Sequence, residues 1–341
     1  MAPLRALIIG PGGAGTAVMD NMKADGRAEP IAFIETRPQR REELAAQYPG
    51  SLIGDGDAFE KVLAESKPDI VVDAGPDYLH SEHTVAALQA GCHVLIEKPM
   101  CTSTPEAAAI LDAEKKSGKV VMVDYTMRYS HPWGTMMAAA RAGRIGKVFY
   151  LGGFYIHDMY DWFAPDGKSR TPWRMHKDHP QNVLFGGGCH GLDLMLCIMG
   201  DDPIVEVCCY ANKMSDSEYP AEDCFEVAMQ FASGVVGKIF VSTGCNRGDF
   251  GRMLEVYGAE GTLVDGKLLR RDHEPEELAQ PTDNVQEGHG WNLTTRDFLD
   301  VIDGKKPNEM NTLFGARNTA VFDAAMQSMR EGGAKKVQWF A

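Results

Sequence analysis

The first 130 residues alternate short apolar runs, rich in β-branched residues, with amphipathic segments, and this alternation limits the possible folds more than any other feature. The apolar runs are RALIIG, PIAFIE, DIVVDAG, HVLIEK and KVVMVDY. Helix-like segments lie after Gly15 and at about 57–65, 81–91 and 104–119. Short strands that alternate with helices are typical of βαβ units, in which helices cover both faces of a parallel sheet. The pattern predicts a doubly wound Rossmann sheet.

The rest of the chain has a different pattern of apolar and polar residues. Longer alternating runs at 147–157, 204–212, 223–244 and 253–264 indicate a large, mostly antiparallel open sheet with one buried face. Helical patterns occur near 188–199, 292–302 and 313–330. Because 341 residues exceed one ordinary hydrophobic core, we predict an α/β protein of two domains. These are a dinucleotide-binding Rossmann domain at 1–130 and an α+β substrate-binding and oligomerisation domain at 131–341, whose C-terminal helix is free to return to the first domain.

Composition narrows the choice of partners. The chain has 34 Lys and Arg against 48 Asp and Glu, a net charge of −14, so its field repels phosphate backbones and anionic headgroups. No apolar run approaches the ~18 residues of a membrane span. The eight cysteines are scattered without a CxxC pair, and together with the lack of a signal peptide they favour a reducing cytoplasm. We therefore expect neither nucleic acid nor membrane as a partner.

A glycine-rich turn, IIGPGGAG, directly follows the first apolar run and opens the first helix-like segment. In this context Gly10 permits a tight turn, Gly12 lets the backbone approach a pyrophosphate, and Gly15 allows the helix to pack closely on the strand. The N-terminus of the helix would then meet the phosphates. A plain strand-to-helix turn is the alternative. We predict that Gly10, Gly12, Gly13 and Ala14 bind a dinucleotide.

The end of the second predicted strand bears on the choice of dinucleotide. Glu35 closes the run PIAFIE, where a carboxylate can accept hydrogen bonds from the adenosine ribose and would repel a 2′-phosphate. Arg37 lies two residues on and could instead pair with that phosphate, or remain a solvated charge in the run RPQRREE. The balance favours NAD as the cofactor and leaves NADP open.

Two further segments, AGPDYLHSEH and GCHVLIEKPM, place polar residues where predicted strands end. Open parallel sheets bind ligands at the carboxyl ends of their strands. Residues of both segments are therefore candidate cofactor contacts: Gly75, Pro76, His80, Glu97 and Lys98. Lys98 is in addition a candidate acid, since the sheet would deliver its ammonium group to this edge.

The order of IIGPGGAG, GPDYLH, AGCHVLIEKPM, GGGCHGLD and EVYGAEGTLV resembles the glucose-fructose oxidoreductase and inositol dehydrogenase family, also called Gfo/Idh/MocA. The resemblance runs nearly end to end, and the AGxHVxxEKP stretch is its most specific part. It implies that the EKP lysine, here Lys98, contacts the substrate and the nicotinamide ribose. It also implies a homo-oligomer, a dimer or tetramer, because open sheets in the family commonly pack face to face.

The segment NVLFGGGCHGLDLMLCIMG is similar to the family's DxGxHxxD segment, which opens a helix lining the substrate pocket. The resemblance makes His190 the general acid/base, because a histidine can take a hydroxyl proton near neutrality. Asp193 would orient that ring, bind a substrate hydroxyl, or act as a plain acid near the helix N-terminus. Gly186 stands where the family has its first acid. Another acid or a substrate group must then support His190, or the chemistry differs from simple alcohol oxidation.

The remaining candidates for substrate contact lie in the second domain: Arg128, His157, Trp173 and Arg174. Aromatic faces and charged hydrogen-bonding groups suit polyhydroxylated ligands, although each residue alone could equally be structural. The run HKDHP could suggest a metal, but hydride transfer needs none, so we predict no metal site.

These features predict an NAD(P)-dependent dehydrogenase acting on a CH–OH group of a sugar, cyclitol or related polyhydroxy compound, with Lys98 and His190 at the reacting carbon. Two alternatives remain. One is a redox-assisted glycoside-cleaving enzyme with tightly bound NAD and no net redox change. The other is a non-catalytic NAD-binding sensor, which the retained Lys98 and His190 argue against and Gly186 keeps open.

Overall fold

A computed structural model describes residues 2–248, 252–279 and 288–341. The chain divides into two compact units, residues 1–125 with 291–316 and residues 126–290 with 317–341. The first unit thus includes a returning segment, where the sequence analysis placed a single boundary at 130; the helix of this segment packs on the first helix of the chain. Within the described residues, no helix has the length and apolarity needed to cross a bilayer.

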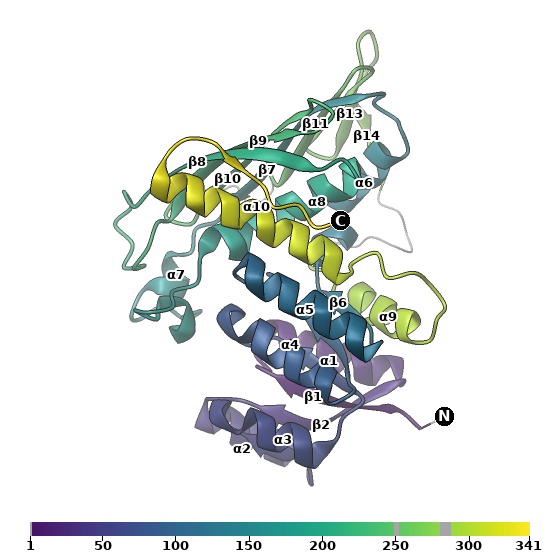
Figure 1. Ribbon diagram of the computed structural model, residues 1–341, viewed down its shortest axis with the longest axis vertical. Coiled ribbons are helices and arrows are strands. Elements are labelled where there is room, and N and C mark those ends of the chain that lie inside the picture. The colour runs from purple at the N-terminus through teal and green to yellow at the C-terminus, as the bar shows by residue number, and fades with distance from the viewer. Residues whose placement is uncertain (1, 249–251, 280–287) are drawn as a thin grey trace. The chain divides into compact units, whose positions relative to one another are not determined.

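The first unit is built on a six-stranded sheet in which every neighbouring pair is parallel, in the order β3-β2-β1-β4-β5-β6 (Figure 1). Its strands are β1 (Leu4–Ile9), β2 (Ala28–Ile34), β3 (Leu52–Gly54), β4 (Ile70–Asp73), β5 (His93–Ile96) and β6 (Val121–Val123). Its helices are α1 (Gly13–Asp25), α2 (Pro38–Gln47), α3 (Phe59–Ser66), α4 (His80–Gln89), α5 (Thr104–Ser117) and α9 (Trp291–Ile302), with short 3-10 turns at Gly56–Ala58 and Asp77–Leu79.

Burial explains why the apolar pattern of this unit predicted most of its strands and helices. All four residues of β4 are buried, as a strand with both faces covered by helices requires. The elements that the sequence analysis did not predict are β3 and α2. The strand β3 is only three residues long and lies at the sheet edge, and α2 buries a single residue, Leu44, so neither carries a strong apolar period. The predicted doubly wound sheet is confirmed.

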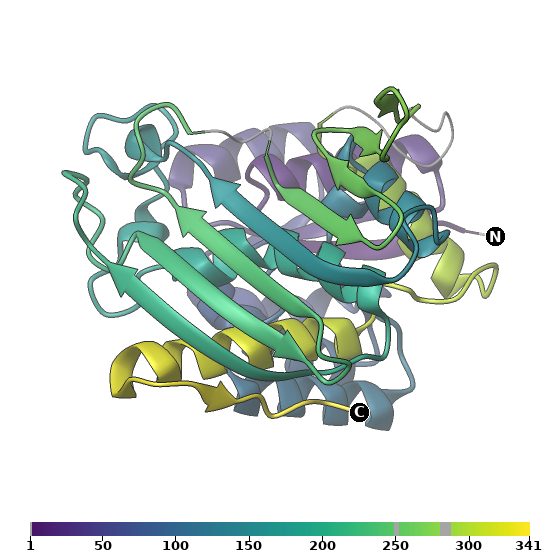
Figure 2. The ribbon, with the colours of Figure 1, turned by 90° about the horizontal axis from the view of Figure 1, so that it is seen from above.

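The second unit is built on a nine-stranded sheet in the order β14-β13-β12-β11-β7-β10-β9-β8-β15 (Figure 2). Only the β7–β10 pair is parallel, so the predicted mostly antiparallel sheet is confirmed. The strands are β7 (Val148–Ile156), β8 (Ile204–Asn212), β9 (Cys224–Phe231), β10 (Val236–Ser242), β11 (Leu254–Gly258), β12 (Thr262–Val264), β13 (Lys267–Leu269), β14 (Glu276–Glu277) and β15 (Lys335–Lys336).

The helices in this part of the chain are α6 (Trp133–Arg141), α7 (Tyr160–Phe163), α8 (Cys189–Met199) and α10 (Thr312–Glu331), and the first residues of α10, up to Ala316, belong to the first unit. A π-helical turn lies at Leu184–Gly188 and 3-10 turns lie at Thr126–Tyr129 and Pro172–Met175. Both α6 and α8 contact strands of this sheet. The start of α8 lies unusually close to β7, because a Cβ on Gly191 would lie 3.0 Å from the Cα of Gly153. This close approach sets His190, the neighbour of Gly191, next to the end of β7.

Candidate active site

The glycine-rich turn joins β1 to α1 and leaves the start of the helix open. Gly10 has a φ of +67°, and a Cβ there would lie 2.5 Å from the carbonyl oxygen of Ala74. A Cβ on Gly15 would lie 2.4 Å from the carbonyl oxygen of Gly10, so both positions require glycine. Among the described residues, no atom lies within 4 Å of a Cβ built on Gly13. The N-terminus of α1 is thus accessible to a phosphate group.

Glu35, at the end of β2, is held by its neighbour Arg37. The backbone N–H and the Nε–H of Arg37 donate to Oε1 at 2.9 and 3.0 Å, and Nη2 donates to Oε2 at 2.7 Å. Burial alone would raise the pKa of Glu35, but these hydrogen bonds and the charge of Arg37 lower it. Glu35 is therefore an anion at neutral pH. The arginine considered as a 2′-phosphate ligand is already engaged by a carboxylate.

A second arginine, Arg40, reaches the glycine turn itself. Its Nε donates to the carbonyl oxygen of Pro11 at 3.3 Å and its Nη2 donates to Oγ1 of Thr16 at 3.3 Å. The sequence analysis missed Arg40 because it treated the whole run RPQRREE as solvated charge. Pro38 at the first turn of α2 is the signal that could have identified the helix, and with it the residue whose side chain returns to the turn.

Two buried histidines support the ends of β4 and β5. His80 faces the carbonyl oxygen of Pro99 through Nδ1 at 2.7 Å and that of Gly75 through Nε2 at 3.2 Å, so it ties the two loops together. His83 contacts the fully buried Asp73 at 3.1 Å. Burial would raise the pKa of Asp73, but the charges of His80 and His83 lower it. These contacts make His80 a support for the loops that carry the predicted cofactor residues.

Lys98 follows β5 at the same sheet edge, next to a pair of acids. Glu97 accepts hydrogen bonds from the backbone N–H of Lys98 at 3.1 Å and from Nε1 of Trp291 at 3.3 Å. Asp124 directly follows β6, and its backbone N–H donates to the carbonyl oxygen of Ile96, so it lies beside the β5 end. The edge thus combines one ammonium group with two carboxyl groups.

Asp124 was not singled out from the sequence, yet it is the least solvated acid of this group. It is 1% exposed, and burial together with the charge of Glu97 raises its pKa well above the ordinary value of 3.8, against the lowering effects of Thr294 and Lys98. The neighbouring Glu97 carboxyl group disfavours a second negative charge beside it, and burial has the same effect on Asp124. Both effects favour the protonated form of Asp124.

In the second unit, the N-terminal turn of α8 places His190 in a group of aromatic rings. His190 is 2% exposed. The ring of Tyr155, on β7, stacks on it with centroids 6.1 Å apart, and the ring of His289 meets it edge-on at 6.5 Å. The hydroxyl group of Tyr155 also contacts Nδ1 of His157 at 3.1 Å. His289, which lies in the run GHGW before α9, is a neighbour that the sequence analysis missed.

Arg128 and Asp193 form a buried ion pair. Nε and Nη2 of the arginine donate to the two carboxylate oxygens of Asp193 at 2.8 and 2.6 Å. Burial alone would lower the pKa of Arg128, but the Asp193 carboxylate raises it; burial raises the pKa of Asp193, and the charge of Arg128 acts against that rise. Both carboxylate oxygens of Asp193 are thus engaged by Arg128, which explains this acid without a role in orienting His190.

The position of the missing family acid is filled by another side chain. A Cβ on Gly186 would lie 2.7 Å from the amide nitrogen of Gln181, so this glutamine occupies the space where a side chain at position 186 would begin. The Oε1 of Gln181 accepts a hydrogen bond from Nη1 of Arg174, and its backbone oxygen accepts one from the hydroxyl group of Tyr219. A neutral amide attached to an arginine therefore stands where the family pattern has a carboxylate.

Arg174 itself lies between two indole rings. Its guanidinium carbon is 5.1 Å from the ring centroid of Trp162 and 4.9 Å from that of Trp173. The ring of Trp162 in turn lies 6.4 Å from that of His157. We call Trp162, Trp173, Arg174 and Gln181 the Arg174 cluster. Of the predicted substrate residues, the structure brings His157, Trp173 and Arg174 into one neighbourhood with Tyr155.

Metal ligands do not converge in the described parts of the chain. Residues 2–248, 252–279 and 288–341 contain no group of three or more His, Cys, Asp or Glu side chains that could hold an ion. In the run HKDHP, the rings of His176 and His179 stack 5.6 Å apart, and Nδ1 of His176 accepts the backbone N–H groups of Asp178 and His179.

The first unit, a six-stranded parallel sheet with an open glycine turn, is a Rossmann fold, and a large open sheet follows it. The chain belongs to the Gfo/Idh/MocA family. Residues 4–125 match the oxidoreductase family with the NAD-binding Rossmann fold, and residues 133–264 match the C-terminal domain of GFO/IDH/MocA proteins. The resemblance seen in the sequence motifs is confirmed.

Individual relatives are distant. The 1-carboxy-3-chloro-3,4-dihydroxycyclohexa-1,5-diene dehydrogenase of Comamonas testosteroni is 25% identical over 70% of this chain and 58% of its own length. The D-glucoside 3-dehydrogenase of Escherichia coli is 31% identical over 43% of this chain and 42% of its own. The chain thus spans about half the length of these two relatives. The crystal structure of the WlbA dehydrogenase from Bordetella pertussis, in complex with NADH and UDP-GlcNAcA, has a TM-score of 0.81 at 20% identity and covers 99% of this chain and 100% of that one.

Proposed function

We propose that this protein is an NAD(P)-dependent dehydrogenase that moves a hydride to or from a hydroxyl-bearing carbon of a polyhydroxy compound such as a sugar or cyclitol. The observation that carries the proposal is the carboxyl edge of the first sheet. That edge presents an open helix start at Gly13 and the ammonium group of Lys98 on loops of the same sheet. The relatives named above act, by their names, on a hydroxylated ring and on a glucoside.

The residues of the first unit fit a dinucleotide. Gly12 and Gly13 leave the N-terminus of α1 uncovered for the pyrophosphate, and Glu35 is an anion suited to accept hydrogen bonds from a ribose. A bound NAD(P) would supply the hydride acceptor, or the hydride donor in the reverse direction. The remaining work, which is to hold the substrate oxygen and move its proton, falls to side chains of this protein.

We propose Lys98 and His190 for these two tasks. The Lys98 ammonium donates a hydrogen bond to the substrate oxygen and stabilises the negative charge that grows there as the hydride leaves. Glu97 precedes it in the chain and accepts a hydrogen bond from the backbone N–H of Lys98. His190 takes the hydroxyl proton at a ring nitrogen and returns it in the reverse direction. One proton and one hydride leave the CH–OH group, which becomes a carbonyl.

A screen for cofactor reduction tests the proposal. The protein is incubated with NAD and with a set of sugars, cyclitols and other polyols, and reduced nicotinamide is followed by its absorbance. We expect reduction with at least one compound, and none with Lys98→Met, while Lys116→Met, an exposed lysine on α5, behaves as wild type. Unchanged turnover by Lys98→Met would contradict the role of this residue. Product formation from a glycoside without net NADH would instead favour the glycoside-cleaving alternative.

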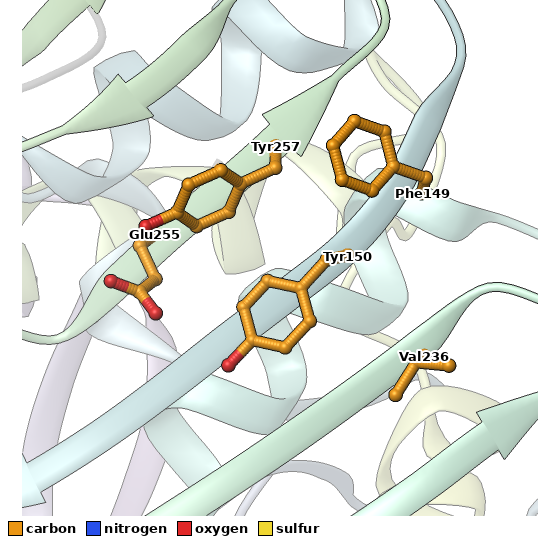
Figure 3. Close-up of a pocket in the computed structure, with 5 residues that line it drawn as sticks. All are labelled: Phe149, Tyr150, Val236, Glu255 and Tyr257. Carbon is orange, nitrogen blue, oxygen red and sulfur yellow. The ribbon is translucent and has the colours of Figure 1, made fainter.

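The outer face of the large sheet supports self-association. Phe149, Tyr150, Val236, Glu255 and Tyr257 line a depression of about 510 Å³ on this face, and Figure 3 shows their side chains. Phe149 and Val236 are 56% and 48% exposed, and a group of exposed apolar side chains is typical of an interaction surface. We infer a homo-oligomer that packs through this face. Sedimentation equilibrium should show a dimer or tetramer, and Tyr150→Glu should shift it toward the monomer; a monomeric wild type would exclude the inference.

A further inference from the structure

The substrate-binding side of the second unit carries a cation where the family pattern carries an acid. Gln181 occupies the space at Gly186, and its Oε1 accepts from Nη1 of Arg174. The backbone N–H of Gln181 also donates to the carbonyl oxygen of Arg174 at 3.2 Å. Two hydrogen bonds therefore fix the arginine relative to the start of α8, through a residue that is only 4% exposed.

The position of the guanidinium group is fixed from two further sides. Trp162 and Trp173 flank it at about 5 Å, a distance at which a cation is attracted to an aromatic face. Such stacking also removes the rotamer freedom that a long side chain would otherwise lose on binding a ligand. The Arg174 cluster is therefore a preorganised cationic group rather than a flexible surface arginine.

The field of Arg174 reaches the ring that stacks on His190. Burial raises the pKa of Tyr155 to about 12, and the charge of Arg174 acts against that rise. Gly187 lets this ring lie close, since a Cβ there would be 2.3 Å from a ring carbon of Tyr155. Side-chain contacts connect the same groups, because Trp162 lies between Arg174 and His157 in a chain of ring contacts and His157 touches the hydroxyl group of Tyr155. The carboxylate nearest in sequence to His190, Asp193, has both oxygens on Arg128.

From this geometry we propose that the substrate oxidised at His190 carries a carboxylate group, and that Arg174 binds it. The proposal rests on the proposed function and names the substrate class for it: sugar acids or other hydroxy acids rather than neutral polyols. A planar guanidinium matches the two oxygens of a carboxylate in a bidentate pair. The bound carboxylate also brings a negative charge to the group of side chains that connects Arg174 with His190.

Matched pairs of ligands test the proposal. D-Glucuronate and D-glucose, and D-galacturonate and D-galactose, are titrated by calorimetry into the NADH-loaded protein. We expect each acid to bind more tightly than its neutral partner by about 10- to 100-fold, as a charged hydrogen-bonded pair provides. Arg174→Gln should remove this preference and leave the affinities for the neutral sugars within about twofold. Equal binding of acid and neutral sugar by the wild type would overturn the proposal.

Three controls keep the result specific. Arg170→Gln changes an exposed arginine of the same loop and should leave the preference intact. Arg174→Lys keeps the charge but loses the fork of N–H groups, so it should retain only part of the preference and guards against a misfolded glutamine variant. A phosphate ester of the same sugar that binds more tightly than the uronate would overturn the carboxylate assignment.

Cofactor reduction by the same pairs separates this proposal from the proposed function. Reduction by neutral polyols that is insensitive to Arg174→Gln leaves the dehydrogenase in place and removes the carboxylate site. Binding of uronates through Arg174 without any cofactor reduction has the opposite meaning, because the anion site then stands and the dehydrogenase does not.

Discussion

At the carboxyl edge of the first sheet the buried charges are mostly acids, whereas around the start of α8 they are mostly cations and imidazoles. The edge contains Glu35 and Asp73, each compensated by a partner two or ten residues away in the sequence. Around α8, the pair of Arg128 and Asp193 joins residues 65 apart. At the cofactor edge, the partner that compensates a charged side chain is thus close in sequence. In the substrate unit, the compensating partner is distant in sequence and is brought close only by folding.

This difference explains what the sequence could predict. The glycine turn, Glu35 and Lys98 lie at strand ends, where the alternation of strand and helix fixes their place at one sheet edge. No local pattern links Gln181 to position 186, because the contact depends on the π-helical turn at Leu184–Gly188. No helix or strand was predicted for residues 158–182. The structure has α7 and a 3-10 turn there, and these bring two tryptophans to one arginine.

The largest effect expected in the substrate unit is the loss of the proton acceptor. His190→Ala should lower kcat by about 10²- to 10⁴-fold, because the hydroxyl proton then has no positioned base. The affinity for NADH should stay unchanged, since the glycine turn belongs to the other unit. Cofactor reduction kinetics with the best substrate of the screen measure both. His176→Ala, an exposed histidine of the second unit, serves as the control; a loss below tenfold in His190→Ala would assign the proton to another group.

The second largest predicted effect comes from breaking the buried ion pair of Arg128 and Asp193. Asp193→Asn leaves the guanidinium of Arg128 buried without its carboxylate, and should reduce the free energy of unfolding by about 3–5 kcal/mol. Replacing both partners, as in Arg128→Met with Asp193→Leu, should restore most of that loss, since well-packed apolar groups need no compensation. Urea unfolding followed by circular dichroism measures the three variants. A single-variant loss below about 1 kcal/mol would mean that solvent reaches the pair.

At the cofactor edge the corresponding test is Asp124, a buried acid whose pKa is raised despite the nearby charge of Lys98. Its pKa in the folded protein is raised above the ordinary 3.8, so its contribution to stability is present below pH 3.8 and is lost as the pH rises toward the folded value. Across that window the wild type should lose up to about 1.4 kcal/mol per pH unit relative to Asp124→Asn. Unfolding free energies at several pH values test this, and parallel curves for the two proteins would show that folding does not raise the pKa of Asp124.

The smallest predicted effect concerns cofactor choice, where a local charge pair decides. In Glu35→Gln the guanidinium of Arg37 loses the carboxylate that now accepts two of its hydrogen bonds. The negative charge that would repel a 2′-phosphate is also removed, so the ratio of NADP to NAD affinity should rise by about tenfold, the value of one charged hydrogen bond. Calorimetric titration of both cofactors measures the ratio. The matched control is Glu43→Gln, which removes an exposed carboxylate that pairs with Arg40. An equal shift in that variant would mean that Arg40, at the glycine turn, and not Arg37 decides between NADP and NAD.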